Sequence, residues 1–245
     1  MTEEDQLLGR NLTIDKDRLW ASLMDMACIG PGVAGGNNRQ ALTDADAEGR
    51  DLFKRWCVAA GLTVQTDKMG SMFARRDGTD PDLPPVMVGS HLDTQPTGGR
   101  FDGVYGVLSA LEVVRTLNDH NIETEHPIEI VSWTNEEGAR FSPAMVGSGV
   151  WSGEFDLDYG LTRMDKEGVT LGQALEGIGY AGHRPTEPGD IKAAFELHIE
   201  QGPILENEKT QIGIVSGVQG MNWYDLKLIG SPVHAGPTQI GRAHV

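Results

Sequence analysis

A short apolar run that ends in a histidine and an aspartate constrains the fold of this chain more than any other stretch. Residues 86–88 are Val-Met-Val, a run typical of a buried strand, and His91 and Asp93 follow directly. Alternate residues of an extended segment point the same way, so His91 and Asp93 should leave the strand end side by side. The Asp93 carboxylate is then placed to accept the free ring N–H of His91, as the partners of metal-bound histidines do.

A helical pattern begins directly after a second aspartate, Asp102. Apolar residues recur at intervals of three and four between residues 104 and 117, as they do on one face of a helix. Asp102 therefore lies at the helix entry, where a carboxylate can cap the helix or present its charge to a cation. Taken alone, the segment is explained as well by a capped helix and a polar loop.

Strand and helix patterns alternate over the first half of the chain. The predicted elements are a helix over 16–28, a helix that Thr43 begins and Gly61 ends, a hairpin over 62–66 and 69–74, and a strand over 127–133. This alternation favours an α/β fold in which helices sandwich a mixed sheet. Ligands of such sheets collect at strand ends, so the loops after Val88 and Trp133 should converge.

The second half of the chain is less regular. Residues 142–190 contain one predicted short helix, behind Thr170. Further strands are predicted over 195–200, 212–215 and 221–229. His198 lies on the polar face of the first of these strands, and a domain change is predicted near residue 213.

Composition and charge exclude several classes of partner. The formal net charge of −16 leaves no basic face for nucleic acid or an anionic membrane, so neither partner is expected. The acidic start of the chain does not resemble a secretion signal, and no apolar run is long enough to span a bilayer. Two cysteines make no disulfide framework, and Cys57, on an apolar helix face, is expected to be a buried thiol. A cytoplasmic enzyme is the resulting expectation.

Four groups at strand or helix ends form a candidate metal site. They are His91, Asp102, Glu137 and His198. Mixed imidazole and carboxylate donors suit Zn²⁺, Mn²⁺ or Co²⁺, and one carboxylate can bridge two ions about 3.5–4 Å apart. In the neighbouring pair, Glu137 can bind metal while Glu136 stays free to take a proton from water. Glu136 and Glu137 could instead form a solvated acidic corner, and His198 could be a satisfied sheet histidine.

Five motifs in this order resemble the hydantoinase/carbamoylase-type amidases, which belong to the dinuclear metallopeptidase superfamily of the aminoacylases. The motifs are His-Leu-Asp-Thr (91–94), Gly-Gly-Arg-Phe-Asp-Gly (98–103), Thr-Asn-Glu-Glu-Gly-Ala-Arg-Phe (134–141), Glu-Leu-His-Ile-Glu-Gln-Gly-Pro (196–203) and Pro-Val-His-Ala-Gly-Pro-Thr (232–238). The fourth motif is similar to the carbamoylase branch in particular. The resemblance implies a zinc-exopeptidase-like catalytic domain with an inserted α+β lid and dimerisation domain.

The resemblance also implies a role for each matching residue. It implies that His91 and His198 hold one ion, that Asp102 bridges and that Glu137 holds the second ion. Glu136 would be the general base and later the acid that protonates the leaving nitrogen. Asp93 would support His91, and Gln201 would touch the substrate. His234, on the lid, would reach into the partner subunit's site of a homodimer and stabilise the tetrahedral oxyanion.

The implied reaction is hydrolysis of a linear ureido or amide C–N bond in a small molecule. N-carbamoyl-L-amino acids, allantoate and β-ureidopropionate all remain open as substrates, and the native metal is open as well. An aminoacylase or dipeptidase on the same scaffold is the first alternative. An inactive fragment that only binds a partner is the second.

The resemblance divides the chain into three parts. Residues 1–212 are predicted to form the N-terminal part of the catalytic domain, and residues 213–239 the beginning of the lid. The family implies a longer chain, with a fifth metal ligand and substrate-binding residues that have no counterpart here. Residues 240–245 back-translate to a common sequencing-adapter read, so they are predicted to be a non-native tail.

Overall fold

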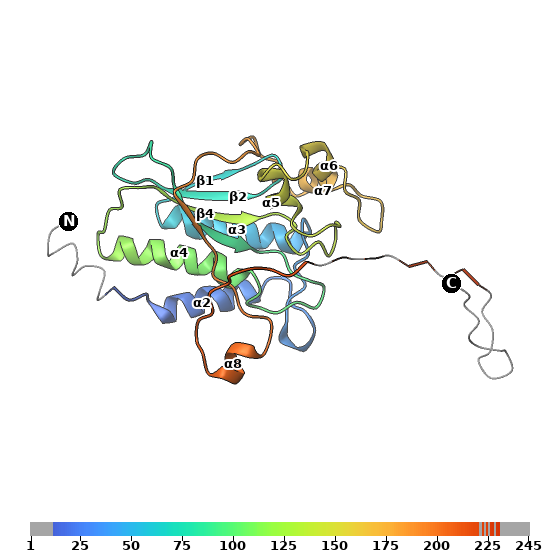
Figure 1. The fold of residues 1–245 in the computed structure, drawn as a ribbon. Coiled ribbons are helices and arrows are strands. Elements are labelled where there is room, and N and C mark those ends of the chain that lie inside the picture. The colour runs from blue at the N-terminus through green and yellow to red at the C-terminus, as the bar shows by residue number, and fades with distance from the viewer. Residues whose placement is uncertain (1–11, 221, 223, 225, 228, 231–245) are drawn as a thin grey trace. The chain divides into compact units, whose positions relative to one another are not determined.

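The computed structural model describes residues 12–220 together with 222, 224, 226–227 and 229–230 (Figure 1). The predicted tail and His234 lie outside the described residues. The chain divides after Gln201 into two compact units, which are described separately. The boundary expected near residue 213 remains a prediction.

The first unit is built on a five-stranded mixed sheet, as predicted. The strands are β1 (Thr63–Thr66), β2 (Met72–Arg76), β3 (Val86–His91), β4 (Ile128–Trp133) and β5 (Ala193–Phe195), in the order β1-β2-β4-β3-β5. β2 is antiparallel to both β1 and β4, as in the expected hairpin. β3 is parallel to both β4 and β5. Parallel pairing places the carboxyl ends of β3 and β4 at the same edge of the sheet.

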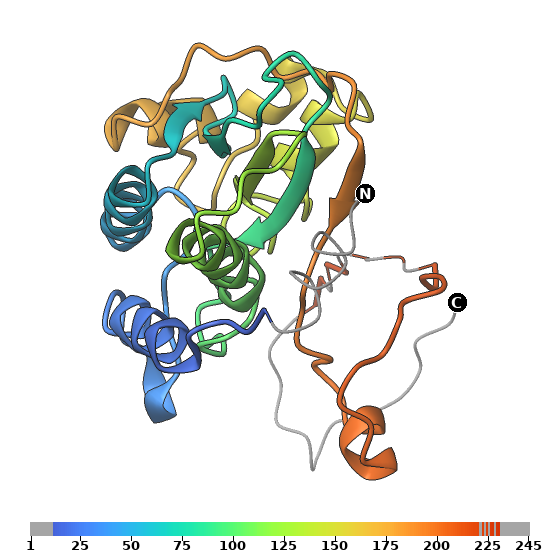
Figure 2. The ribbon, with the colours of Figure 1, turned by 90° about the vertical axis from the view of Figure 1, so that its left-hand side faces the viewer.

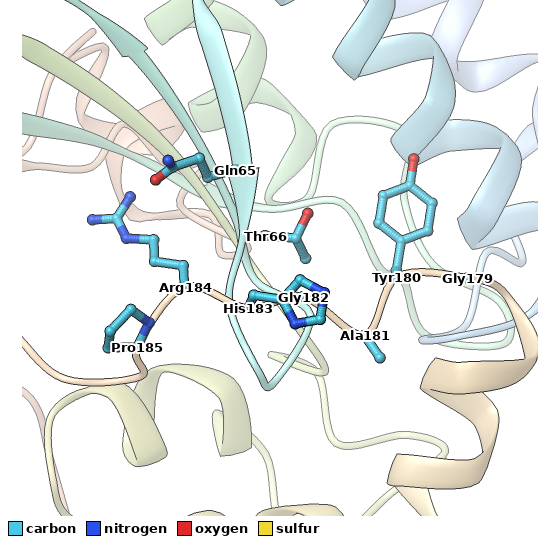
Figure 3. Close-up of a pocket in the computed structure, with 9 residues that line it drawn as sticks. All are labelled: Gln65, Thr66, Gly179, Tyr180, Ala181, Gly182, His183, Arg184 and Pro185. Atoms are coloured by element: carbon cyan, nitrogen blue, oxygen red, sulfur yellow. The ribbon is translucent and has the colours of Figure 1, made fainter.

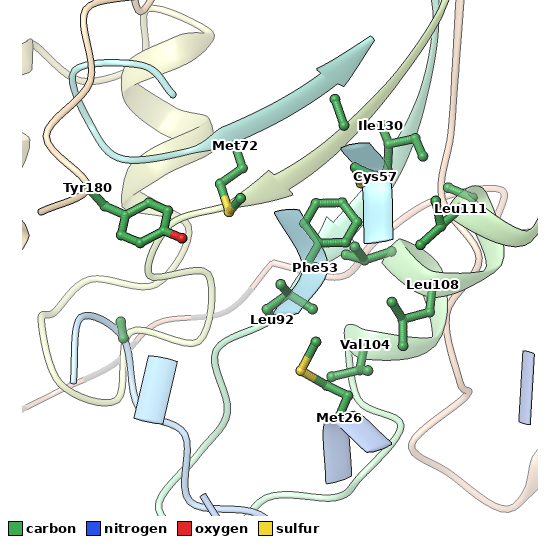
Figure 4. Close-up of a cluster of buried hydrophobic side chains, with 14 of the residues drawn as sticks. Met26, Phe53, Cys57, Met72, Leu92, Val104, Leu108, Leu111, Ile130 and Tyr180 are labelled. Atoms are coloured by element: carbon green, nitrogen blue, oxygen red, sulfur yellow. The ribbon is translucent and has the colours of Figure 1, made fainter. Parts of the chain in front are cut away.

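Three long helices lie on one side of this sheet (Figures 1 and 2). They are α2 (Lys16–Ala27), α3 (Asp44–Ala59) and α4 (Val104–Asp119). Each agrees with a predicted helix, and the Thr43 side chain caps α3 by accepting a hydrogen bond from the Asp46 N–H. The apolar faces of the helices meet the sheet in one core, where Phe53, Cys57 and Leu111 are fully buried (Figure 4). Cys57 is a buried free thiol, as expected.

The opposite face of the sheet carries a smaller apolar cluster. Trp133 packs edge-on against Phe73. The ring centre of Trp151, in α5 (Val146–Trp151), lies 5.3 Å from the ring centre of Trp133. α5 and α6 (Leu157–Leu161) fall in the segment where only one short helix was expected, so that prediction was incomplete. Each is six residues or fewer, too short to show a helical period. The expected helix, α7 (Leu171–Gly177), has a Thr170–Gln173 capping box.

The strand predicted over residues 195–200 is wrong for most of its length. β5 ends at Phe195, which faces Val88 of β3, and the chain then leaves the sheet. A methyl group on Gly106 would lie 2.5 Å from the Leu197 carbonyl oxygen, so residue 197 passes directly against α4. The alternation of residues 195–200 therefore reflects an extended segment that packs on a helix instead of pairing with a strand.

The second unit contains one helix among its described residues, α8 (Ile204–Glu208). The strand predicted over 212–215 is not formed, and the side chains of residues 211–220 are exposed. A strand needs a neighbour to pair its N–H and C=O groups, and these described residues have none in the sheet. In the described part of the chain, no helix has the length and apolarity needed to cross a membrane.

Candidate metal centre

The two sequence motifs that follow β3 and β4 meet at one edge of the sheet. His91 is the last residue of β3 and pairs in register with Trp133, the last residue of β4. Asn135 then adopts a left-handed conformation (φ 54°), which turns the chain sharply into Glu136 and Glu137. The predicted convergence of these loops is confirmed.

Three predicted ligands bring their donor atoms together. One atom each from His91, Asp102 and His198 lies within 4.8 Å of the others. The Nε2 atom of His198 is 3.2 Å from Oδ1 of Asp102, and the Nε2 atom of His91 is 4.0 Å from the same oxygen. Two imidazoles and a carboxylate are a donor set that suits Zn²⁺, Co²⁺ or Mn²⁺.

Asp102 faces this cluster and does not cap α4. The N-cap of α4 is Gly103, and no side chain accepts a hydrogen bond there. The Asp102 carboxylate instead lies beside His198, and its Oδ2 accepts a 2.7 Å hydrogen bond from the Gln201 amide. The hydrogen bond with His198 lowers the pKa of Asp102 and raises that of His198 to about 9. The capping alternative is therefore wrong, and the anionic-ligand alternative matches the geometry.

Gly103 makes room for the His91 ring. Its φ is +66°, and a Cβ atom built on it would lie 2.3 Å from His91 Nε2. Only glycine leaves that nitrogen free to face Asp102. The space left by Gly103, together with the three converging donor atoms, fits a divalent ion whose ligands include His91 Nε2.

Asp93 has different partners from those expected. The Nδ1 atom of His91 lies 2.8 Å from the Asp93 backbone carbonyl oxygen and 3.8 Å from the Asp93 carboxylate. The carboxylate instead accepts the backbone N–H groups of Glu136 and Glu137, each at 3.2 Å. Asp93 thus orients His91 through its main chain and fixes the Glu-Glu turn through its side chain.

The two glutamates of that turn have separate surroundings. Oε2 of Glu136 lies 3.3 Å from His91 Nε2, and burial raises the pKa of the Glu136 carboxyl. Oε2 of Glu137 accepts a 2.6 Å hydrogen bond from Gln95, while its Oε1 is buried without a partner among the described residues. Glu137 is not part of the three-residue cluster, so its role as a ligand stays a prediction. Gln95 was missed from the sequence, because a glutamine in a polar turn gives no local signal.

A separate cavity of about 500 Å³ lies between β1 and the Gly179–Pro185 segment (Figure 3). None of the predicted site residues lines it. Two of the polar side chains along it have partners: the Arg184 guanidinium donates to Glu129, and the Tyr180 hydroxyl donates to Asp51. The predicted site residues described above therefore lie away from this cavity, at the edge of the sheet where β3 and β4 end.

The chain is similar in sequence to a family of known proteins. Residues 87–242 match the sequence profile of peptidase family M20/M25/M40. The chain is 59% identical over 230 residues to an N-carbamoyl-L-amino-acid amidohydrolase from Rhizobium meliloti, a match that covers 94% of this chain and 55% of the relative. It is 33% identical over 238 residues to a ureidoglycolate hydrolase from Arabidopsis thaliana, covering 94% and 50%.

A solved structure is similar over most of the chain. The crystal structure of a hydantoinase/carbamoylase family amidase from Burkholderia ambifaria matches with a TM-score of 0.80 and 61% identity. The match covers 81% of this chain and 48% of that one. The chain thus spans about half the length of the relatives that it matches.

Proposed function

Because this chain belongs to peptidase family M20/M25/M40, we propose that it carries the metal-binding part of a hydrolase that cleaves the linear C–N bond of a ureido compound. The observation that carries the proposal is the approach of His91, Asp102 and His198 to within 4.8 Å of one another. These residues come from three segments that are separate in the sequence, and together they supply two imidazoles and a carboxylate.

His91 and His198 would hold the first ion, with Asp102 between them, and Glu137 would hold a second. The orphan Oε1 of Glu137 supports this assignment, because a buried carboxylate oxygen without a partner is costly unless a ligand satisfies it. A divalent ion held by these residues would supply hydroxide at neutral pH by lowering the pKa of water to about 7.

Glu136 would act as the general base. Its carboxylate lies beside the His91 ring but is not part of the donor cluster, so it is free to accept a proton from the attacking water. Its raised pKa brings the carboxyl closer to neutral pH, where a base can also return its proton to the leaving nitrogen. The Asp93 carboxylate supports this role by holding the backbone N–H of Glu136.

The names of two relatives support a substrate class. The amidohydrolase at 59% identity is named for N-carbamoyl-L-amino acids, and the hydrolase at 33% for ureidoglycolate. Both names describe a linear ureido group, and the higher identity favours an N-carbamoyl-L-amino acid here. Water would add to the ureido carbonyl carbon, the bond to the amino-acid nitrogen would break, and the products would be the amino acid, CO₂ and ammonia.

Two further assignments complete the proposal. Gln201 would contact the substrate through its side-chain amide. In this structure that amide donates a hydrogen bond to the Asp102 carboxylate, which would also bind metal, so Gln201 would give up this hydrogen bond. His234, which lies outside the described residues, would stabilise the oxyanion in the site of a partner subunit of a homodimer.

Metal analysis combined with one substitution tests this function. A protein that extends this chain to the full length of its relatives is expected to retain Zn²⁺, Mn²⁺ or Co²⁺ after dialysis and to hydrolyse N-carbamoyl-L-amino acids faster than N-acetyl amino acids or dipeptides, whereas the 245-residue chain is expected to show little or no turnover. Glu136→Gln should keep its metal and lose at least about a hundredfold in turnover, the usual contribution of a general base. A preference for dipeptides or N-acyl substrates would favour the aminoacylase or dipeptidase alternative. A chain without bound metal, or with unchanged turnover after Glu136→Gln, would refute the proposal.

A further inference from the structure

Arg39 is a buried cation without a carboxylate partner. Its side chain is fully buried, and no ion pair to it is formed among the described residues. Its guanidinium donates instead to three backbone carbonyls, those of Met26 (3.2 Å), Ile29 (2.9 Å) and Leu92 (2.9 Å). Burial lowers the pKa of Arg39, as expected for a charge taken out of water. Such a group is costly, so its presence calls for an explanation beyond filling the core.

The surroundings of Arg39 are shaped for an arginine. Met26 lies in the last turn of α2 and Ile29 two residues beyond the helix, at the end that carries the negative pole of the helix dipole. A methyl group on Gly49 of α3 would lie 2.9 Å from Arg39 Cδ, so this glycine provides the slot through which the side chain runs. The guanidinium thereby joins the end of α2 to Leu92, the residue directly after the metal-site histidine.

The main chain of Arg39 contacts the same segment. Its N–H donates to the Thr94 hydroxyl (2.8 Å), and its carbonyl accepts the Thr94 N–H (2.9 Å). The Thr94 N–H and the Asp93 carbonyl belong to one planar peptide group and point in opposite directions. That Asp93 carbonyl is the group that lies 2.8 Å from His91 Nδ1. The side chain of Arg39 holds the preceding carbonyl, that of Leu92, so Arg39 fixes the peptide groups on both sides of Asp93.

We propose that Arg39 is the positioning residue for the His91 ring. By fixing the two peptide groups that flank Asp93, it aims the Asp93 carbonyl at Nδ1 of His91. The proton then stays on Nδ1, and the lone pair of Nε2 faces Asp102 and His198. This role rests on the proposed function, since it matters for binding only if Nε2 of His91 is a metal donor.

Lysine and methionine substitutions separate positioning from packing. A lysine keeps the charge but offers one point donor, whereas the planar guanidinium reaches Leu92 and the end of α2 together. A methionine keeps most of the volume and removes every side-chain donor, so the bond to the Leu92 carbonyl is lost while the main-chain bonds to Thr94 can remain. Arg184 provides a matched control, because its guanidinium makes two hydrogen bonds to Glu129 and lies 3.8 Å from the centre of the Phe73 ring. Arg184→Met therefore removes partly buried contacts without touching residues 89–94.

The test uses Co²⁺ binding by the 245-residue chain, followed by its visible absorption spectrum, with amide hydrogen exchange of residues 89–94. Arg39→Met is expected to weaken Co²⁺ binding about 10- to 100-fold and to change the spectrum, the range found when partners of metal-bound histidines are replaced. Arg39→Lys should fall between wild type and Arg39→Met. Exchange at residues 89–94 should accelerate in both variants more than exchange in β2. Arg184→Met should lower the melting temperature and leave the Co²⁺ affinity and spectrum unchanged.

Two results would overturn the inference. One is an Arg39→Met chain that melts earlier but binds Co²⁺ with the affinity and spectrum of wild type, which would make Arg39 a packing residue only. The other is exchange at residues 89–94 that is no faster than elsewhere. If the wild-type chain binds no Co²⁺, the proposed function fails, and the exchange data alone then decide whether Arg39 orders the segment. If Arg39→Met does not fold, Arg39→Lys carries the same comparison.

Discussion

Replacing Gly103 with alanine tests the candidate metal centre at its tightest contact. The Cβ atom would lie 2.3 Å from Nε2 of His91, whereas ordinary contact begins at 3.4 Å, so the ring would have to retreat by 3.4 − 2.3, or about 1.1 Å. His91 is only 2% exposed, and its Nδ1 is held from behind by the Asp93 carbonyl. The ring therefore has little room to retreat along its own axis. Metal sites tolerate changes of only about 0.2 Å in ligand distance, so His91 should be lost as a ligand.

Alanine substitutions at two other glycines are controls that separate the effect of this steric clash from the effect of backbone strain. An alanine at φ +66° also costs about 1–2 kcal/mol, because left-handed conformations crowd the Cβ atom. Gly153→Ala imposes the same type of strain (φ +81°), and Gly99→Ala changes the same loop as Gly103→Ala; among the described residues, only chain neighbours lie within 4 Å of either new Cβ atom. The assay is Zn²⁺ affinity by calorimetry, alongside thermal unfolding of each variant.

We expect Gly103→Ala to lose at least about a hundredfold in Zn²⁺ affinity, the upper end of what indirect changes around a metal ligand cost. Gly153→Ala should lose stability but not affinity, and Gly99→Ala should lose neither. If Gly103→Ala binds Zn²⁺ as tightly as Gly153→Ala does, then His91 Nε2 is not a ligand, and the role inferred for Gly103 is refuted.

Three further predictions concern stability. Burial raises the pKa of Asp67 to about 7, above its ordinary value near 3.9, so the folded state binds the proton more tightly than the unfolded state. The stabilisation from the protonated Asp67 carboxyl is complete below about pH 4 and is lost as pH rises to about 7. The Asp67→Asn variant does not titrate, and its Oδ1 can still accept the Met69 and Ser71 N–H groups. Measured by urea unfolding, the free energy of unfolding of Asp67→Asn relative to wild type should therefore rise by up to about 4 kcal/mol between pH 4 and pH 7. An equal pH dependence in the two chains would contradict this assignment. Thr43→Ala should cost about 1 kcal/mol through loss of the α3 cap, read from the urea midpoint, and an unchanged midpoint would argue against the cap. Phe53→Ala, in the centre of the core, should cost about 3–5 kcal/mol by the same measurement, and a loss below about 1 kcal/mol would argue against its burial.

Much of the fold could be predicted because its signals are local. The helices over α2, α3 and α4 follow from apolar residues on one face, and Thr43 and Thr170 each satisfy backbone donors within three residues of themselves. The hairpin of β1 and β2 follows from alternation and turn residues. α5 and α6 were missed because they are too short to contain a period, and β5 was overextended because alternation does not reveal whether a neighbouring strand continues.

The candidate site was predictable in its chemistry and less so in its contacts. The sequence alone identified the residue types and the strand ends that bring His91 close to Glu136, since parallel neighbours end at one edge of a sheet. It did not reveal that Asp93 reaches His91 through its carbonyl and the glutamate turn through its carboxylate. Nor did it single out Arg39, because a lone arginine in a polar loop shows no sign of burial.

The amino-acid sequence by itself therefore determined the three long helices, the hairpin, the mixed sheet and the set of donor groups, since these depend on side-chain periodicity and on chemistry carried by each residue. Only the tertiary structure decided that those donors meet. His198 reaches Asp102 because the chain leaves β5 and runs against Gly106, and His91 faces Asp102 because Gly103 has no side chain. Both outcomes depend on close approach between segments that are distant in the chain, and the packing of α4 against the sheet sets those distances.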